Sequence, residues 1–171
     1  MEIRPATLDD LPGITAIYNH VLATSTAIYS ETPSTLEVRR AWLEDRWAHR
    51  YPVHVAAQGG DVHGFASFGD FRSWPGYRYT VEHTVHVRAD RRRSGVGGAL
   101  VESLLEPARA LGKHAILGAI DADNAPSIRL HEHLGFERVA HLPEVGRKFG
   151  RWLDLVLMQR LLDERGAARG D

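Results

Sequence analysis

Residues 91–98 read Arg91-Arg92-Arg93-Ser94-Gly95-Val96-Gly97-Gly98 and lie between a predicted strand over residues 79–87 and a predicted helix over residues 95–111. A turn at such a junction leaves backbone N–H groups unpaired, its glycines let a ligand approach closely, and the helix dipole adds positive potential. These conditions suit a phosphate or pyrophosphate, and the three arginines can pair with its oxygens. The alternative is a tight turn that serves close helix packing.

The same stretch argues against the two common nucleotide-binding loops. A P-loop needs Gly-Lys-Ser/Thr after the turn, whereas Gly97-Gly98-Ala99 follows here, without the lysine for the terminal phosphates or the hydroxyl for magnesium. A dinucleotide-binding fold places its glycines after the first strand and not near residue 95.

The residues on both sides of the turn predict a mixed α/β fold of the α+β kind. Along residues 79–87 valines alternate with polar side chains, so this strand carries a polar face in the middle of the sheet. The other predicted strands cover residues 3–6, 53–58, 62–68, 114–120, 136–142 and 153–160. Hairpin strands joined to strand-helix-strand units imply a mixed sheet covered by helices.

Capping residues predict where the other helices begin. Thr7 is the expected N-cap of a first helix. Ser34 and Glu37 have the form of a capping box for a second helix, which should run to about His49. Asn124 should cap a short last helix that ends before Gly135.

Three large apolar residues recur at helical spacing in the second predicted helix. They are Trp42, Leu43 and Trp47. The spacing favours a place in the core, and a ligand wall is the alternative.

Composition narrows the class of protein. The chain has 171 residues, which suits one domain, expected over residues 1–163 with a flexible tail at 164–171. Lys and Arg number 21 against 22 Asp and Glu, so no global field would hold the chain on nucleic acid or an anionic membrane. There is no cysteine, which excludes disulfides, thiolate metal sites and a cysteine nucleophile.

The first residues, Met1-Glu2-Ile3-Arg4-Pro5, lack the basic and apolar regions of a secretory signal, and no apolar run reaches membrane-spanning length. The expected location is the cytoplasm.

Two separate motifs resemble the GNAT superfamily of acetyl-coenzyme A-dependent N-acetyltransferases. Arg92-Arg93-Ser94-Gly95-Val96-Gly97 matches the coenzyme loop Gln/Arg-x-x-Gly-x-Gly/Ala of that family. Asn124 and Leu134-Gly135-Phe136 match its downstream signature, an asparagine that opens a short helix ending in Leu-Gly-Phe. The resemblance implies a mixed, mostly antiparallel sheet of about seven strands flanked by four helices.

Three longer strings resemble the phosphinothricin and methionine sulfoximine/sulfone N-acetyltransferase branch of the family. They are Tyr79-Thr80-Val81-Glu82-His83-Thr84-Val85-His86-Val87, Ala119-Ile120-Asp121-Ala122-Asp123-Asn124 and Val145-Gly146-Arg147-Lys148-Phe149-Gly150-Arg151-Trp152-Leu153-Asp154. The branch implies a homodimer that acetylates the α-amine of a small amino-acid-like substrate.

The resemblance also implies roles for individual residues. The coenzyme is expected to contact the backbone of Val85, His86 and Val87, the turn Arg92, Arg93, Ser94, Gly95, Val96, Gly97 and Gly98, and Asn124. The amino-acid pocket is expected to be lined by Arg72, Ser73, Trp74, Glu82, His83 and Thr84.

Acetyl transfer to an amine needs a neutral amine, a polarised carbonyl and a proton for the leaving thiolate. Glu82 is the predicted general base, because it lies on the polar face of the strand that leads into the coenzyme loop; a solvated carboxylate is the alternative. Backbone N–H groups near Val85 to Val87 could polarise the carbonyl if the strand is incompletely paired. His131 stands where many family members carry a tyrosine as the acid, and it is either that acid or a packed, hydrogen-bonded histidine.

The ten histidines do not form a recognisable metal motif. His83 and His86 point to opposite faces of a strand, and His131 and His133 are nearly opposite on a helix. No metal is expected.

The loop Phe71-Arg72-Ser73-Trp74-Pro75-Gly76-Tyr77-Arg78 combines two guanidinium groups with aromatic faces, which suits an amino acid held by its carboxylate. A surface loop with solvated arginines is the alternative. Lys148, Phe149 and Arg151 are expected either to close over the pocket or to belong to a dimer contact.

Three functions fit these observations: a small-amino-acid N-acetyltransferase, an enzyme that acetylates a protein or peptide amine, and a non-catalytic acyl-coenzyme A sensor. Glu82 favours an enzyme, since a sensor needs no base. The loop rich in arginine and tryptophan favours a small anionic acceptor over a peptide.

Overall fold

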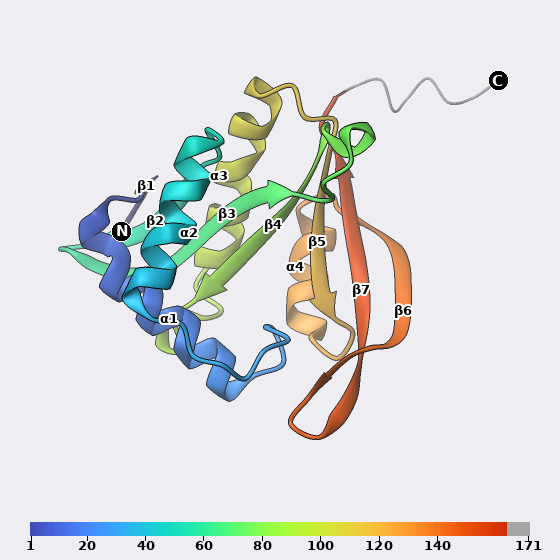
Figure 1. Ribbon diagram of the computed structural model, residues 1–171, viewed down its shortest axis with the longest axis horizontal. Coiled ribbons are helices and arrows are strands. Elements are labelled where there is room, and N and C mark those ends of the chain that lie inside the picture. Colours follow the sequence, from blue (N-terminus) through green and yellow to red (C-terminus); the bar gives the residue numbers. More distant parts are fainter. Residues whose placement is uncertain (164–171) are drawn as a thin grey trace.

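Within residues 1–163, which the computed structural model describes, seven strands form one sheet in the order β1-β2-β3-β4-β5-β7-β6 (Figure 1). The strands are β1 (Glu2–Pro5), β2 (Val53–Gln58), β3 (Asp61–Asp70), β4 (Thr80–Val87), β5 (Ala115–Asp121), β6 (Glu137–Lys148) and β7 (Arg151–Leu161). The helices are α1 (Leu11–Thr24), α2 (Leu36–Ala48), α3 (Val96–Ala110) and α4 (Ala125–His133). Only β4 and β5 pair in parallel in this part of the chain. The predicted mixed, mostly antiparallel sheet with four helices is confirmed.

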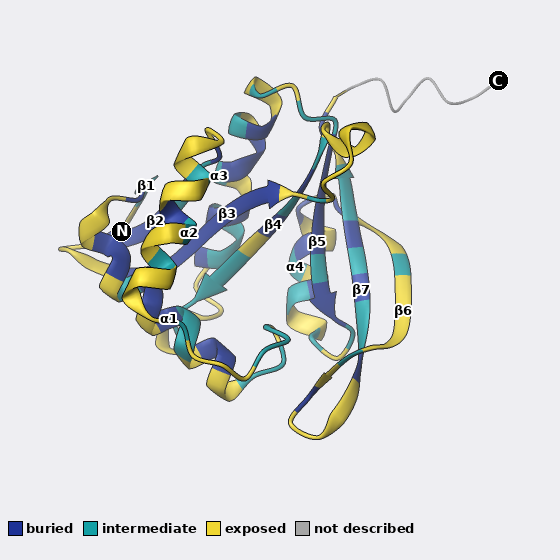
Figure 2. Cartoon of the chain, in the orientation of Figure 1, coloured by how far each residue is buried: buried dark blue, intermediate teal, exposed yellow. Residues whose placement is uncertain are grey.

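Two apolar layers cover the two faces of the sheet. Alternate residues of β3 serve different layers: Phe65 packs with α1 and α2, whereas Ala66 and Phe68 pack with α3. Figure 2 shows the helices buried on their inner sides and exposed on their outer sides, while β6 is exposed along much of its length. No helix among residues 1–163 is long and apolar enough to cross a membrane. The predicted tail, residues 164–171, lies outside the described residues.

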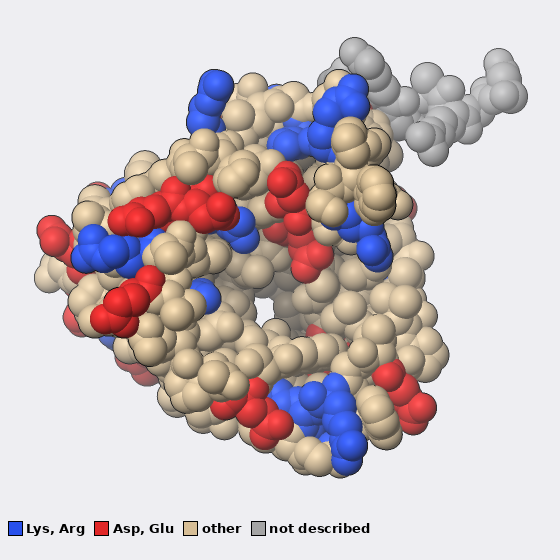
Figure 3. All heavy atoms as spheres, in the orientation of Figure 1, with Lys and Arg blue, Asp and Glu red and all other residues tan. Residues whose placement is uncertain are grey.

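The strands β4 and β5 separate halfway along the sheet. Their pairing runs from Thr80 with Ala115 to His83 with Gly118 and then stops. Beyond that point β4 stays paired with β3 as far as Val87, while β5 stays paired with β7. Figure 3 shows this face of the molecule hollowed between the two strands, with side chains of both charges around the hollow. After the separated end of β4 the chain passes through a 3₁₀ turn (Ala89–Arg91) into α3, and after that of β5 it enters α4 at Ala125.

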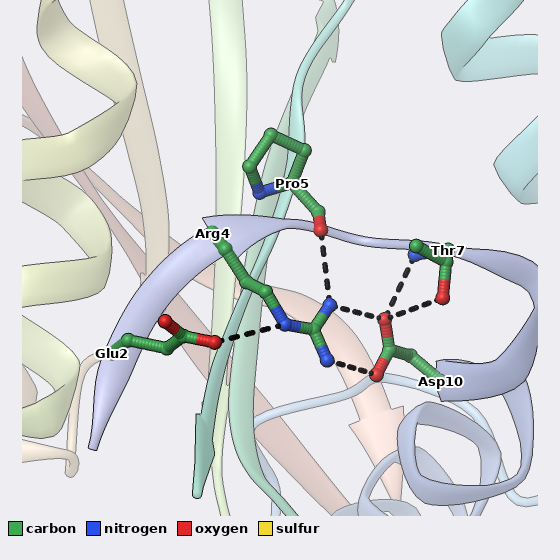
Figure 4. Close-up of polar contacts among 5 residues, drawn as sticks. All are labelled: Glu2, Arg4, Pro5, Thr7 and Asp10. Atoms are coloured by element: carbon green, nitrogen blue, oxygen red, sulfur yellow. Dashed lines mark hydrogen bonds and ion pairs between the residues drawn. The ribbon is translucent and has the colours of Figure 1, made fainter. Parts of the chain in front are cut away.

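The start of the chain is fixed by one acidic side chain. Arg4 donates to both carboxylate oxygens of Asp10, at 2.7 and 2.8 Å, and the backbone N–H of Thr7 donates to the same carboxylate at 2.8 Å (Figure 4). These bonds, led by the one from Arg4, lower the pKa of Asp10. Thr7 therefore caps a 3₁₀ turn (Leu8–Asp10) that precedes α1, instead of capping α1 itself as the sequence predicts.

The second helix departs from the sequence prediction in two details. Its N-cap is Thr35, whose side chain accepts from the N–H of Val38, and not Ser34. The backbone of Ser34 is fixed by Asn19 of α1 instead: its N–H donates to the side chain of Asn19, and its carbonyl accepts from the same side chain. Leu43 is fully buried, as predicted for the core, but Trp47 is 40% exposed.

The last two strands are longer than predicted. They form a hairpin that continues to Lys148 and restarts at Arg151, with a register shift between Leu142 and Gly146. Within the shift Glu144 has a φ of +50°, and its N–H donates to Asp154 at 2.8 Å. The irregular residues form a bulge within the hairpin, so the strand continues past residue 142, where the sequence pattern predicts its end.

Candidate active site

The turn at residues 91–98 presents free donors at the start of α3. Gly95 is the N-cap in a left-handed conformation, with a φ of +82°, and the first intrahelical bond runs from Ala99 N–H to Gly95 O. The N–H groups of Val96, Gly97 and Gly98 have no acceptor within residues 1–163. The first turn of α3 contains no acidic residue, so nothing there competes with an anionic ligand.

Gly97 and Gly98, which carry two of these donors, line a cavity of about 670 Å³. Its wall combines Arg91, Arg92 and Arg93 with Gly95, Gly97 and Gly98. It also includes Val85, His86 and Val87 from the separated end of β4, Asn124 and Ser127 at the start of α4, Thr24 at the end of α1, and Ser25, Thr26 and Ala27 after it. Many of the residues predicted to hold the coenzyme therefore lie around one space; Ser94 and Val96 do not line it directly.

Asn124 is placed by its own helix. Its side-chain oxygen accepts from the N–H of Ser127 at 3.2 Å and so caps α4, as predicted. This bond holds the side chain on the wall of the first cavity and of a second, adjoining cavity of about 410 Å³. The two cavities also share Val85 and His86, so they meet where β4 and β5 separate.

Glu82 lies in the second cavity, together with His83 and Thr84. It is half-buried on β4, opposite Gly69 of β3 and Leu117 of β5. Burial raises the pKa of the Glu82 carboxyl, and the nearby charge of Arg72 opposes this rise. A half-buried carboxylate with a raised pKa beside a cavity is suited to accept a proton near neutral pH.

The loop between β3 and β4 stands outside both cavities. Arg72 lies near enough to influence Glu82 and rests over the ring of Phe71, with 5.1 Å to its centroid. Trp74 is 74% exposed, and Arg72, Ser73 and Trp74 line neither cavity. Of the six predicted substrate residues, the structure therefore brings Glu82, His83 and Thr84 to the second cavity and places Arg72, Ser73 and Trp74 on the wall of neither cavity.

His83 and His131 form a buried pair that the sequence spacing does not reveal. Their Nε2 atoms lie 3.1 Å apart, and Nδ1 of His131 is 2.7 Å from the carbonyl of Ser127. Since a carbonyl only accepts, Nδ1 of His131 carries a proton; in the neutral pair Nε2 of His131 then accepts from Nε2–H of His83. This leaves Nδ1 of His83 as a bare acceptor, which matches its lack of a partner within residues 1–163.

Burial lowers the pKa of both rings, and in His83 the neighbouring His131 and His86 lower it further. The pair is therefore neutral at physiological pH. His83 on β4 and His131 on α4 meet because α4 packs on β5, the strand paired with β4, and no sequence spacing carries that information.

The loop of the last hairpin contributes unequally to the site. Phe149 and Arg151 line the first cavity, as one of the two sequence interpretations holds. Lys148 is 1% exposed, and its Nζ atom contacts backbone carbonyls in the last turn of α1 and in the segment after it instead of reaching a cavity. Within residues 1–163 no cluster of three or more His, Asp or Glu side chains is arranged to hold a metal ion.

Comparisons with known proteins agree on one family. The family model described as "Acetyltransferase (GNAT) family" matches residues 14–136. A methionine sulfoximine/methionine sulfone acetyltransferase of Pseudomonas aeruginosa is 50% identical over 167 residues, 97% of each chain. A phosphinothricin N-acetyltransferase of Streptomyces viridochromogenes is 38% identical over 162 residues, 94% of this chain and 87% of that one.

A solved structure shares the fold closely. It is a GNAT superfamily phosphinothricin acetyltransferase from Sinorhizobium meliloti in complex with acetyl-CoA, with a TM-score of 0.93 and 34% identity, covering 99% of this chain and 92% of that one.

Proposed function

The chain belongs to the GNAT family of acetyltransferases, and we propose that it moves an acetyl group from acetyl-CoA to the α-amine of a small amino-acid-like substrate of the methionine sulfoximine, methionine sulfone or phosphinothricin type. One observation carries this proposal. A cavity with free helix N-terminal donors and three arginines opens, where β4 and β5 separate, into a cavity that contains Glu82.

The first cavity fits the diphosphate of acetyl-CoA. The unpaired N–H groups of Gly97 and Gly98 and the guanidinium groups of Arg92 and Arg93 supply donors for phosphate oxygens. Gly97 and Gly98 leave open the space beside the backbone that a Cβ atom would occupy, 3.4 Å from the side chain of Leu130, which also lines the cavity. The free edge of β4 from Val85 to Val87, with Asn124, borders the passage to Glu82.

Acetyl-CoA, when bound, supplies the acetyl group and a thiol leaving group. The carboxylate of Glu82 takes one proton from the substrate ammonium, directly or through a water, and so makes the amine nitrogen nucleophilic. Backbone N–H groups at the unpaired end of β4 stabilise the negative charge that develops on the acetyl oxygen. The ammonium loses two protons in all while the leaving thiolate gains one, so each turnover releases one proton.

For His131 the geometry supports the packed role over the acid role. Its Nδ1 donates to Ser127 and its Nε2 accepts from His83, so in the neutral pair neither nitrogen is free to donate to a third group. We therefore infer that solvent supplies the thiolate's proton. His131 instead positions His83 on the wall of the second cavity.

We also propose a homodimer. Several large apolar side chains of the β6–β7 hairpin face outward, among them Val145 at 55% and Trp152 at 59% exposure. A second copy would remove them from water. Sedimentation velocity tests the proposal, because a monomer at micromolar concentration contradicts it.

A thiol-release assay tests the function. Purified protein and acetyl-CoA are offered methionine sulfone, methionine sulfoximine, phosphinothricin and a panel of peptides, and acetylated products are identified by mass. The proposal expects coenzyme thiol from at least one of the three amino-acid analogues and none from the peptides. Acetylation of peptides alone, or tight coenzyme binding without any turnover, would overturn it.

A further inference from the structure

Lys148 is buried and yet makes no contact with a carboxylate among the described residues. Its Nζ atom lies 2.6 Å from the carbonyl oxygen of Leu22, 2.7 Å from that of Ser25 and 2.7 Å from that of Ile28. An ammonium group has three protons and a neutral amine only two, so three simultaneous bonds to carbonyls require the charged form. A buried charge is costly unless it is fully hydrogen-bonded, and this one is.

The three carbonyls belong to the end of α1 and the segment after it. Leu22 lies in the last turn of α1, where carbonyls have no intrahelical partner and the helix dipole favours a cation. Ser25 and Ile28 lie in irregular backbone, whose direction no regular hydrogen-bonding pattern determines. One ammonium group therefore ties residues 25–28, which follow the C-cap of α1, to the last turn of that helix.

This segment forms a wall of both cavities. Ser25, Thr26 and Ala27 line the first cavity, and Ala27, Ile28 and Tyr29 line the second. A change in the path of the segment would thus alter the space for both substrates at once.

A second tie holds the same wall to the same hairpin. The Tyr29 hydroxyl donates to the carbonyl of Asp154 at 2.9 Å, and its ring lies so close to Gly146 that a Cβ atom there would meet ring carbons. Phe149, which directly follows Lys148, lines the first cavity from the other side. The β6–β7 hairpin therefore contacts residues 22–29 at two places, through Lys148 and through the backbone around Gly146 and Asp154.

We propose that Lys148 is a positioning residue of the acetyl transfer: its ammonium group gathers the carbonyls of Leu22, Ser25 and Ile28 and so shapes residues 25–29 as the common wall of the coenzyme and acceptor cavities. The inference rests on the proposed function for its kinetic part. The conformational part, that Lys148 orders this segment, stands on the hydrogen bonds alone.

The test uses Lys148→Met, which keeps the length of the side chain and removes all three donors, beside Lys148→Gln and Lys148→Arg, which keep some. Lys113→Met is the matched control, because Lys113 is the chain's other lysine, donates to the carbonyl of Arg78, and lines neither cavity. Kinetic constants are measured at a temperature well below the thermal unfolding midpoint of each variant.

The expected result is a rise in KM for acetyl-CoA and for the acceptor of about tenfold or more in Lys148→Met, with smaller rises in the variants that retain donors. The value of kcat should fall much less. Mere destabilisation would lower the active fraction and hence kcat while KM stays unchanged. Comparing the change in KM with the change in kcat therefore distinguishes a positioning role from a purely structural one. Equal KM values in Lys148→Met and Lys113→Met would overturn the proposal.

Hydrogen-deuterium exchange supplies a readout that does not depend on activity. Amides of residues 22–29 should exchange faster in folded Lys148→Met than in wild type, while those of β2 and β3 stay unchanged. If Lys148→Met does not fold, Lys148→Gln is measured in its place. Unchanged exchange in this segment overturns the inference. If the wild type acetylates no analogue but exchange responds as expected, the proposed function fails and only the conformational part, that Lys148 orders this segment, stands.

Discussion

Nε2 of His131 lies 3.1 Å from Nε2 of His83, and the two rings stack with their centroids 5.0 Å apart and 14° between their planes. Gly118 makes room for this pair. A Cβ atom at that position would lie 2.9 Å from Nε2 of His83 and 3.2 Å from Nε2 of His131.

Gly118→Ala should therefore push the two rings apart. We expect a loss of about 1–3 kcal/mol in the free energy of unfolding, as is usual when a packed core receives an extra methyl group. Urea unfolding measures the loss. Gly76→Ala is the control, because its added methyl group would meet nothing within 4 Å. The same stability in both variants would contradict the tight packing around the pair.

The buried pair should make stability depend on pH. The pKa of His83 is lowered to about 3, so the unfolded chain binds a proton between that value and the ordinary histidine range while the folded chain does not. Stability is therefore complete above the unfolded pKa and falls as pH drops below it.

His83→Phe keeps a ring of similar size and removes this titration. The loss of unfolding free energy from pH 7 to pH 5 should be about 1–2 kcal/mol smaller in the variant than in wild type. Urea titrations at both pH values test this, and parallel losses in the two proteins would show that His83 is not held neutral.

Glu82→Gln should lower kcat by about 10²-fold or more, since general-base catalysis contributes on that order. Affinity for coenzyme A should stay nearly unchanged, because Glu82 lines the second cavity and not the first. Steady-state kinetics and calorimetry measure the two effects separately. Undiminished turnover would remove Glu82 from the mechanism.

Arg72→Met should move the acid limb of the pH profile. Activity requires the unprotonated carboxylate, so kcat/KM rises as pH increases through the pKa of Glu82. Burial raises that pKa and the charge of Arg72 lowers it, so removing the charge raises it further. The limb should shift to higher pH in the variant. A shift to lower pH, or none, would mean that Arg72 does not act on the base.

Much of the fold follows from local sequence signals. The period of apolar residues and the glycines at 95, 112 and 135 place α3 and α4 within one residue of their observed ends. The errors occur where a tertiary contact prevails over a local preference. Asn19 holds Ser34, so the cap moves to Thr35, and the bulge at Glu144 lets β6 continue.

The site is predictable to the extent that its residues are neighbours in sequence. The turn at 91–98 and the strand around Glu82 are continuous motifs, and both border the cavities. The contacts of His131 with His83 and of Lys148 with Leu22 join residues from distant parts of the chain. They depend on where β4 and β5 separate and on how the last hairpin folds back, and neither feature has a signature in a single sequence.

The turn at the start of α3 is the feature on which the proposed function depends most, and isothermal titration calorimetry with coenzyme A tests its role directly. We expect one molecule bound per chain, with a dissociation constant on the order of 1 µM to 1 mM, the usual range for enzyme substrates. Gly98→Asp should weaken binding at least tenfold without loss of stability, because a carboxylate at a helix N-terminus stabilises the helix but repels phosphate, whereas Gly98→Ala should weaken it less. No heat of binding from folded wild-type protein would contradict the account.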